Sequence, residues 1–480
     1  MGFKDLREYL GYLEDKGMLR RVTKEVDRDW EIAALCREVF LRYDKENRPA
    51  LLFENVKGFE SPVAVGVIGG SSNIYATALG IPTEDMGHNV GKRWADAIAN
   101  RVPVTMVSDG PVKENILTGD QIDIFQFPHP IWTAEHDPGY FLTASCVISK
   151  HPVTGVQNMG CYRCQLKGKE KMGIHFPREF RNIPAHVQAN NELNRPTPVA
   201  IVIGADPTIP LAAVASLPRC VDELEVAGAL RGKPVEMVRC ETIDIEVPAT
   251  AEIVIEGEIP PNYEEPEGPF GEYHGYMGSH TVSPIVDIKA ITYRNDPIYH
   301  AYVSQMPPSE NSLMRSFGRE SGVYSHLKDQ LLLPVKDVHL TESSGAMAYM
   351  IISADRLYPG QFWQLVWGAW SVDPSLGKFT VVVDGDIDIR DPFQVEWAMS
   401  WRVRPDKDVH IVNNTIAATQ DPSLVPNGTP KEDPGRALAS KIVIDATRHH
   451  AFPPASLPPE DHMKTIRARW KEYGIGYCRR

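Results

Sequence analysis

Short β-type runs, separated by turn residues at close intervals, fill the middle of this 480-residue chain from about residue 111 to 305. The clearest runs are at 147–149, 199–203, 253–255, 285–293 and 298–303. A parallel sheet of repeated βαβ units would need a helical pattern between successive strands, and the sequence shows a single helical stretch here, at about 222–230. The spacing therefore predicts a β-barrel or a sandwich at the centre of the chain.

Helical and strand patterns alternate on both sides of this centre. Apolar residues at helical spacing occur in 3–16 before it and in 309–327 after it. At roughly 100–200 residues per domain, a chain of this length holds two to four domains. We predict an α+β fold in four parts: an N-terminal α/β segment over 1–110, a β domain over 111–305, an α/β domain over 306–452, and a linker with a terminal helix over 453–480.

The terminal helix is predicted from an apolar stripe. Met463, Ile466, Trp470 and Tyr473 fall on one helical face, and Gly474 stands where a helix commonly ends. A lone amphipathic helix must dock this stripe. The stripe could dock on the helix's own domain or on a neighbouring subunit, and the sequence does not decide between them.

Charge and cysteine content narrow the class of protein. The chain carries 63 acidic and 50 basic residues, a net charge of −13, which argues against a nucleic-acid partner because such proteins need a basic surface. Seven scattered cysteines favour a reduced environment over a disulfide scaffold. We find no run of 18 apolar residues and no apolar secretory stretch near Met1, so we expect a cytoplasmic protein without a membrane partner.

Two motifs resemble known sites without meeting their requirements. Cys161 and Cys164 form a CxxC pair, but structural zinc needs a second ligand pair and no other CxxC or HxxxH occurs. The glycines at 66, 69 and 70 follow a strand but do not match GxGxxG. We interpret the first as coincidence and the second as a tight turn.

An acidic stretch at 264–276 is the most unusual in the chain. Two glycines and a proline fix the backbone between Glu267 and Glu272. Two carboxylates held this way could share one site, with one charged and the other able to carry a proton. The alternative is a solvated acidic loop.

A second group of polar residues lies upstream. Arg163, taken alone, is typical of a surface ion pair, His175 of a core histidine, and Glu223 of an acid at a helix start. Taken together, Asn158, His175 and Glu223 offer oxygen, nitrogen and oxygen ligands, a set that suits Mn²⁺ or Mg²⁺ better than zinc. Spacing alone does not join them.

Four ordered motifs give the sequence a family resemblance. They are Asn158-Met-Gly-Cys-Tyr-Arg163, the stretches 222–232 and 247–252, and Pro266-Glu267-Gly-Pro-Phe-Gly-Glu272-Tyr-His-Gly-Tyr276. With them the chain resembles the UbiD family of reversible decarboxylases, which includes polyprenyl-hydroxybenzoate and ferulic acid decarboxylases. The resemblance implies a UbiD-like fold in which 111–305 is a split β-barrel that binds prenylated FMN and 306–452 is an oligomerisation domain.

The resemblance also implies the cofactors and their residues. The family binds prenylated FMN through a divalent metal, usually Mn²⁺, with K⁺ nearby. By motif position the metal ligands would be Asn158, His175 and Glu223. The residues that contact the flavin would be these three and Cys161, Tyr162, Arg163, Ile174, Phe176 and Lys378, with the match of Lys378 to a phosphate-binding lysine resting on position alone.

Arg163, Glu267 and Glu272 match the family's catalytic network. The implied reaction is non-oxidative decarboxylation of an unsaturated, aromatic or heteroaromatic carboxylic acid through a covalent prenylated-FMN adduct, with Glu272 as the proton donor. A physiological carboxylase, or the catalytic subunit of a larger carboxylase complex, would use the same residues. A flavin-binding or assembly protein without catalysis is the alternative from another class.

The implied partners are the carboxylic acid substrate, CO₂, and a flavin prenyltransferase that supplies the cofactor. The family forms homodimers or homohexamers, and we expect one of these here. The segment 303–315 could reach the pocket, where Arg315 or Asn311 would contact the substrate. A surface helix start is the alternative.

Overall fold

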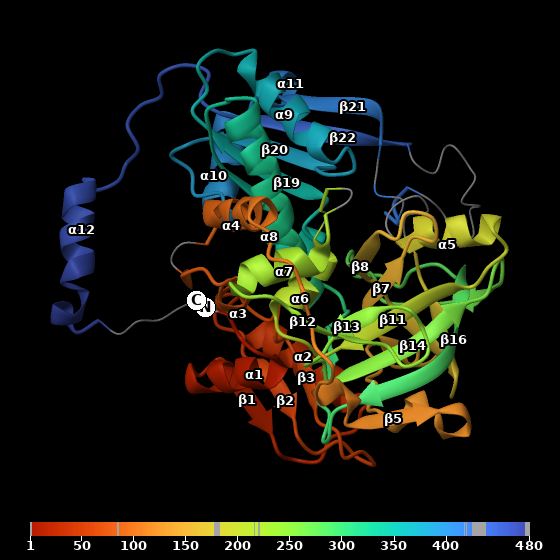
Figure 1. Ribbon diagram of the computed structural model, residues 1–480. Helices are drawn as coiled ribbons and strands as arrows, with labels where there is room; N and C mark the ends of the chain where they lie inside the picture. The colour runs from red at the N-terminus through yellow and green to blue at the C-terminus, as the bar shows by residue number, and fades with distance from the viewer. Residues whose placement is uncertain are drawn as a thin grey trace.

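The computed structural model describes residues 2–83, 86–176, 183–215, 217–218, 221–416, 418, 420–424 and 438–475. Within these residues the strands form sheets of four, ten, three and five members. Figure 1 shows the five-stranded sheet at the top of the molecule, and the N-terminal elements and the ten-stranded sheet side by side below it. No helix in the described part of the chain has the length and apolar character needed to cross a membrane.

The four-stranded sheet combines three strands near the N-terminus with one strand from about residue 300. Its order is β1 (Leu19–Val22), β2 (Ala50–Phe53), β3 (Val63–Val65) and β17 (Tyr299–Ala301), and β17 pairs in parallel with β3. Side chains alternate between its faces, so α1 (Leu6–Asp15) packs on one side and α2 (Glu31–Arg42) on the other. Two further helices, α3 (Ser72–Leu79) and α4 (His88–Ala99), complete this part.

The glycines at 66, 69 and 70 form the predicted tight turn, and the turn binds a carboxylate. The backbone amides of Gly66, Ile68 and Gly69 donate to the carboxylate of Glu310 at 3.1, 3.2 and 3.0 Å. Gly66 has φ +74°, a conformation that favours glycine. The turn therefore fastens the N-terminal segment to the start of helix α8 (Glu310–Ser325).

The ten-stranded sheet is antiparallel throughout, in the order β6-β9-β10-β16-β14-β11-β7-β8, with β5 and β15 also paired to β16. Its strands are β5 (Asn115–Thr118), β6 (Phe141–Leu142), β7 (Cys146–Lys150), β8 (Gln157–Cys161), β9 (Cys164–Gly168), β10 (Lys171–Ile174), β11 (Thr197–Ile203), β14 (Ile253–Ile259), β15 (Glu264–Glu267) and β16 (Thr281–Tyr293).

The connection from β8 to β9 shows that this sheet curls. The two strands lie near opposite ends of the strand order, yet only Tyr162 and Arg163 join them. A chain advances at most about 3.6 Å per residue, so these two residues can bridge only a short gap. The ends of the strand order must therefore approach each other at Arg163.

The central region contains more helices than the single one predicted from the sequence. The structure has α5 (Ile183–Glu192), α6 (Thr208–Val214) and α7 (Glu223–Arg231), and only α7 is the predicted helix. Prolines near the start of α5 and inside the seven-residue α6 hide the helical period in the sequence. A three-stranded sheet of β4 (Thr105–Met106), β12 (Glu236–Arg239) and β13 (Glu246–Pro248) lies nearby.

The C-terminal sheet has the order β18-β19-β20-β22-β21, with three parallel strands in its middle. They are β19 (Tyr349–Ala354), β20 (Phe379–Asp384) and β22 (Leu438–Ala446), flanked by antiparallel β18 (Val335–Leu340) and β21 (Val409–Ile416). Helix α9 (Gln361–Val372) and helix α10 (Pro392–Arg402) pack against the sheet in two separate hydrophobic cores. The short α11 (Pro405–Asp408) precedes β21. The polar Pro/Gly stretch at 420–437, whose composition is typical of a loop, lies for the most part outside the described residues.

The terminal helix forms as predicted but stands away from the body. Helix α12 (Glu460–Ala468) and the single 3₁₀ turn Trp470–Tyr473 have no buried residue. Figure 1 shows α12 at the end of an extended linker, apart from the other elements. The structure therefore shows no docking of the apolar stripe on the helix's own domain.

Candidate active site

Arg163 lies at the β8–β9 connection and binds both carboxylates of the acidic turn. Its Nε and Nη2 each donate to one oxygen of Glu267 at 2.9 Å, a bidentate pair. Its Nη1 donates to Oε1 of Glu272 at 2.6 Å. Glu267 and Glu272 lie 104 and 109 positions after Arg163 in the sequence, and the curl of the sheet brings the three residues together.

The acidic turn is held in place from several sides. Glu267 ends β15, and Gly268, at φ +79°, turns the chain and donates its N–H to Oε1 of Gln165 at 3.2 Å. The N–H of Glu272 donates to the carbonyl of Tyr276 at 3.0 Å. The turn is therefore not the solvated acidic loop that the sequence left open, because both glutamates are buried or nearly so.

Burial and charge set the two carboxylates apart. The side chain of Glu267 is fully buried and receives two hydrogen bonds from Arg163, while that of Glu272 is 13% exposed and receives one. Burial raises the pKa of Glu272, and Arg163 offsets part of that rise. Burial would lower the pKa of Arg163, but its hydrogen bonds and charge interactions with Glu267 and Glu272 outweigh this and raise it. Glu272 is thus the carboxyl better placed to carry a proton.

A second polar pair lies at the other end of β8. Asn158 Nδ2 donates to Oε1 of Glu223 at 2.7 Å, and the N–H of Met159 donates to Oε2 at 2.9 Å. Burial raises the pKa of Glu223 to about 7, because hydrogen bonds only partly compensate for lost solvation. The Oδ1 atom of Asn158 is buried and has no hydrogen-bond partner within the described residues. The pair therefore presents oxygen atoms suited to a hard cation.

His175 lies next to Arg163 and Glu267. It follows β10, its N–H donates to the carbonyl of Arg163 at 3.1 Å, and its Nδ1 is 3.7 Å from Oε2 of Glu267. Two of the three predicted metal ligands, Asn158 and Glu223, are thus in direct contact, whereas the ion-pair contact of His175 is with Glu267. Its role as the third ligand stays a prediction. Within the described residues no cluster of three or more His, Cys, Asp or Glu could hold a metal by itself.

The other predicted flavin contacts flank Arg163. The rings of Tyr162 and Phe176 meet edge to face with their centres 5.1 Å apart. Ile174 is fully buried at the end of β10. Burial raises the pKa of Cys161 to about 12, so its thiol stays protonated at neutral pH. Tyr162, Ile174 and Phe176 belong to one apolar core, and the Arg163 guanidinium lies over the ring of Phe270, 5.4 Å from its centre.

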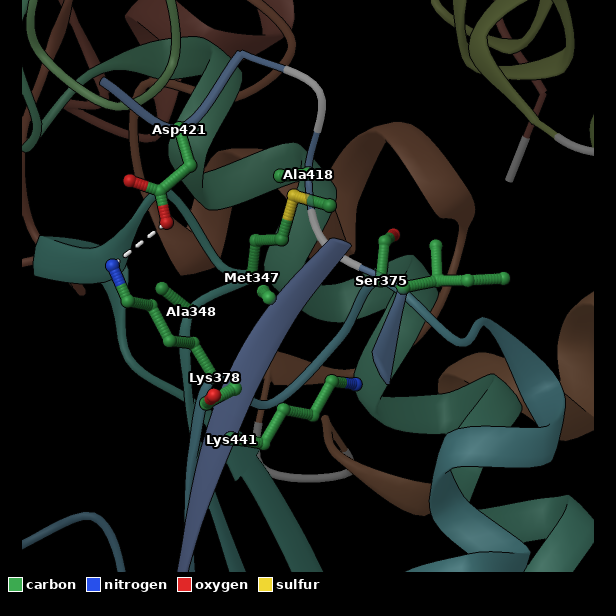
Figure 2. A pocket seen from close by; sticks show the side chains of 10 residues that line it. Met347, Ala348, Ser375, Lys378, Ala418, Asp421 and Lys441 are labelled. Carbon is green, nitrogen blue, oxygen red and sulfur yellow. Dashed lines mark hydrogen bonds and ion pairs between the residues drawn. The ribbon is translucent and has the colours of Figure 1, made fainter. Parts of the chain in front are cut away.

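Lys378 belongs to the C-terminal sheet. It precedes β20, and its Nζ donates to Oδ2 of Asp421 at 2.8 Å and to Oγ of Ser423 at 2.5 Å. Figure 2 shows this ion pair at a small hollow whose lining also includes Met347, Ser375 and Lys441. In this structure Lys378 is thus paired with Asp421. Its contact with the flavin phosphate stays a prediction.

One acid near the site was missed from the sequence. Asp137 accepts hydrogen bonds from the N–H groups of Trp132 and Thr133 at 3.0 and 2.8 Å, and its Oδ1 is buried without a partner within the described residues. Burial raises its pKa to about 6, and the charge of Arg163 lowers that value in part. The Asp-Pro-Gly sequence at 137–139 signals a turn but gives no sign of proximity to Arg163.

Fold and site together define a carboxy-lyase. Family models for the N-terminal, Rift-related and C-terminal domains of 3-octaprenyl-4-hydroxybenzoate carboxy-lyase match residues 10–94, 105–307 and 312–446. The chain therefore belongs to the UbiD family and is a UbiD-type carboxy-lyase, as the motifs predicted. The UbiD-like fold, mixed α/β with several sheets, is confirmed by the solved structures below.

Three similar proteins illustrate the relationship. The Synechocystis protein sll0936 is 34% identical over 98% of this chain and 96% of its own. The UbiD-class enzyme HmfF from Pelotomaculum thermopropionicum, solved in complex with FMN, is 37% identical with a TM-score of 0.84, covering 96% of this chain and 99% of that one. Vanillic acid decarboxylase from Sedimentibacter hydroxybenzoicus, in closed form, is 29% identical with a TM-score of 0.80, covering 99% and 100%.

Proposed function

We propose that this protein catalyses the non-oxidative, reversible decarboxylation of an unsaturated, aromatic or heteroaromatic carboxylic acid with prenylated FMN as cofactor. The observation that carries the proposal is the Arg163 guanidinium bound to Glu267 and Glu272 at the point where the central sheet curls. Two similar structures support the cofactor, since HmfF was solved with FMN and an evolved dimeric form of HmfF with prFMN.

The residues of this chain fit the cofactor and its metal. The buried and unpaired Oδ1 of Asn158 beside the Glu223 carboxylate is the kind of incomplete oxygen set that a divalent cation completes. We assign Mn²⁺ or a similar ion to Asn158, Glu223 and His175, with K⁺ nearby. The curled ten-stranded sheet would be the split β-barrel that holds the flavin, and Lys378 would reach the phosphate after leaving Asp421.

The catalytic residues then have distinct tasks. When bound, prenylated FMN supplies a sink for the electrons that loss of CO₂ leaves on carbon. Arg163 binds Glu267 through two hydrogen bonds and fixes the position of Glu272 through a third. Glu272, whose pKa is raised by burial, gives its proton to the carbon that has lost CO₂. In the reverse direction the Glu272 carboxylate would take that proton, so high CO₂ would favour carboxylation.

A substrate panel tests the proposal. The protein is reconstituted with prenylated FMN, Mn²⁺ and K⁺, and offered aromatic, heteroaromatic and cinnamic-type acids while CO₂ release and ultraviolet absorbance are followed. We expect turnover of at least one acid, and labelled bicarbonate should enter the product when the reaction is run backwards. Equal turnover by protein that has never received the prenylated flavin would contradict the proposal.

A further inference from the structure

Two cysteines lie opposite each other on the strands that lead to Arg163. Strands β7 and β8 are antiparallel neighbours, and Cys146 at the start of β7 pairs in register with Cys161 at the end of β8. Residues directly opposite each other in such a pair point to the same face of the sheet. Both side chains accordingly contribute to one hydrophobic core, Cys146 as a buried member and Cys161 as a partly buried one. The sheet therefore brings together two thiols that are well separated in the sequence.

The hydrogen-bond pattern gives the two cysteines the closer of the two spacings in an antiparallel ladder. The N–H of Tyr162 donates to the carbonyl of Ser145 at 3.3 Å, so these neighbouring residues belong to a hydrogen-bonded pair. Such pairs alternate with non-hydrogen-bonded pairs, whose Cα atoms lie only about 4.5 Å apart. Cys146 and Cys161 occupy a non-hydrogen-bonded pair. A disulfide usually joins Cα atoms about 4.4 to 6.8 Å apart, and the spacing of this backbone pair falls within that range.

The CxxC motif offers Cys161 a different partner, and the fold disfavours it. Cys164 begins β9 and is fully buried in another hydrophobic core, where its thiol donates to the carbonyl of Tyr162 at 3.6 Å. Cys161 is partly exposed, and its thiol donates to the carbonyl of Thr143 at 3.7 Å. A thiol is a weak donor, so rotation about the Cα–Cβ bond of Cys161 can release this contact and turn the sulfur toward Cys146.

The two thiols differ in access, and this difference sets the order in which they react. Cys146 is 3% exposed, whereas Cys161 is partly exposed and is the thiol that a small oxidant can reach. Burial raises the pKa of both thiols, that of Cys161 to about 12, so little thiolate exists at neutral pH. Because the thiolate is the reactive form, oxidation is slow, and both thiols persist under reducing conditions. Only sustained oxidation would join them.

We propose that Cys146 and Cys161 form a redox modification site, which a small organic disulfide converts reversibly into a cross-strand disulfide. The Cys161 sulfur attacks the oxidant, forms a mixed disulfide and expels one thiol. The Cys146 sulfur then attacks the Cys161 sulfur and expels the second thiol. The protein loses two electrons and two protons, and the two expelled thiols carry them away. Because only Tyr162 separates Cys161 from Arg163, the new bond restricts the guanidinium that holds both proposed catalytic acids.

Disulfide mapping tests the site. The full-length protein is treated with hydroxyethyl disulfide in mildly alkaline buffer, the remaining thiols are alkylated, and an unreduced digest is analysed by mass spectrometry. We expect peptides joined through Cys146 and Cys161, which dithiothreitol separates. Cys146→Ala should leave Cys161 as a mixed disulfide with the reagent, whereas the matched control Cys164→Ala should form the same bond as the wild type. A bond from Cys161 to Cys164, or no bond between Cys146 and Cys161 in the wild type, would overturn the proposal, and the wild-type result decides even if Cys146→Ala fails to fold.

The effect of the disulfide on activity rests on the proposed function and is measured separately. Wild-type protein is oxidised, reconstituted with prenylated FMN, Mn²⁺ and K⁺, and assayed for CO₂ release beside a sample that is reduced again before reconstitution. We expect a loss of about 10- to 100-fold in the oxidised sample, because displacement of a positioned group is costly, and recovery in the reduced one. Unchanged CO₂ release by protein in which mapping finds the bond complete would overturn the inferred effect on Arg163. Failure of untreated protein to release CO₂ from any acid would overturn the decarboxylase proposal instead, and the mapped bond would still stand.

Discussion

Arg163 divides its donors unequally between two acids, and this asymmetry gives each acid its proposed task. Glu267 receives two hydrogen bonds in a fully buried position, so it is held firmly in place. Glu272 receives one and keeps some exposure, so it can exchange a proton. A second cation, Arg315 on α8, also acts on Glu272 through its charge, and it forms no ion pair within the described residues. Small changes in charge at these side chains should therefore alter the rate.

The pKa of Glu272 predicts how the rate depends on pH. As proton donor Glu272 acts only when protonated, and burial raises its pKa above the ordinary value of 4.5. We expect kcat for decarboxylation to fall as pH rises through this raised pKa. By the same sign, the contribution of Glu272 to stability is complete below 4.5 and is lost as pH rises through the folded-state pKa. CO₂ release measured across pH, with circular dichroism to confirm folding, checks this. A rate that climbs with pH over this range would contradict the assignment.

The site residues show what the sequence could and could not provide. The motifs identified Arg163, Glu267 and Glu272 through a family resemblance, since no spacing rule joins residues more than 100 positions apart. Asp137 escaped notice because its proximity to Arg163 exists only in the fold. Arg315 was a candidate beside a surface helix start, and its buried Nε could be seen only in three dimensions.

At the scale of elements, one buried carboxylate connects the N-terminal part to α8. Glu310 is fully buried and accepts from the amides of Gly66, Ile68 and Gly69, and from that of Val303 at 3.3 Å. Because α8 also carries Arg315, this contact helps to place the second guanidinium. Sequence spacing predicted the turn and the helix separately, but not that one binds the other.

Replacing Glu310 should loosen this connection. In Glu310→Gln, an amide NH₂ faces backbone N–H donors, so we expect a Tm several degrees lower, corresponding to about 1–3 kcal/mol. Glu38→Gln is the control, because the exposed Glu38 pairs with Arg42 on the surface of α2, and loss of such a surface pair should change Tm little. Thermal unfolding followed by circular dichroism measures both. Equal Tm values for the two variants would contradict the role of Glu310.

Local signals decided which elements were predicted well. Helix α10 begins at clear sequence signals, since Asp391 caps it through the N–H of Phe393 and Pro392 stands at its first position. Helices α5 and α6 were missed because prolines interrupt their pattern. The strand β17 was expected in the central domain, yet it pairs with β3, and such long-range pairing leaves no local trace.

For the whole molecule, the detached terminal helix predicts assembly. Helices of fewer than about 12 residues are marginal alone in water, and α12 has nine with none buried. Helix α10 also exposes Phe393, Trp397 and Trp401, spaced four residues apart on one face. We therefore expect a homodimer or homohexamer in which α12 packs on a neighbouring copy.

Removing the terminal helix tests this expectation. Protein lacking residues 453–480 should show a smaller mass than the full chain in light scattering coupled to size-exclusion chromatography, while its circular dichroism spectrum keeps the features of a folded core. A full-length protein that is already monomeric would contradict the expectation, as would an unchanged oligomer after the deletion.

The proton transfer assigned to Glu272 is the centre of the account, and Glu272→Gln tests it most directly. The measurement is CO₂ release by the reconstituted variant on the best substrate of the panel, with flavin content matched by absorbance. Glu265→Gln is the control, because Glu265 lies on the same strand β15 but pairs with Lys171. We predict a loss of about 10²- to 10⁴-fold for Glu272→Gln and near wild-type turnover for Glu265→Gln. Full turnover by Glu272→Gln would contradict the account.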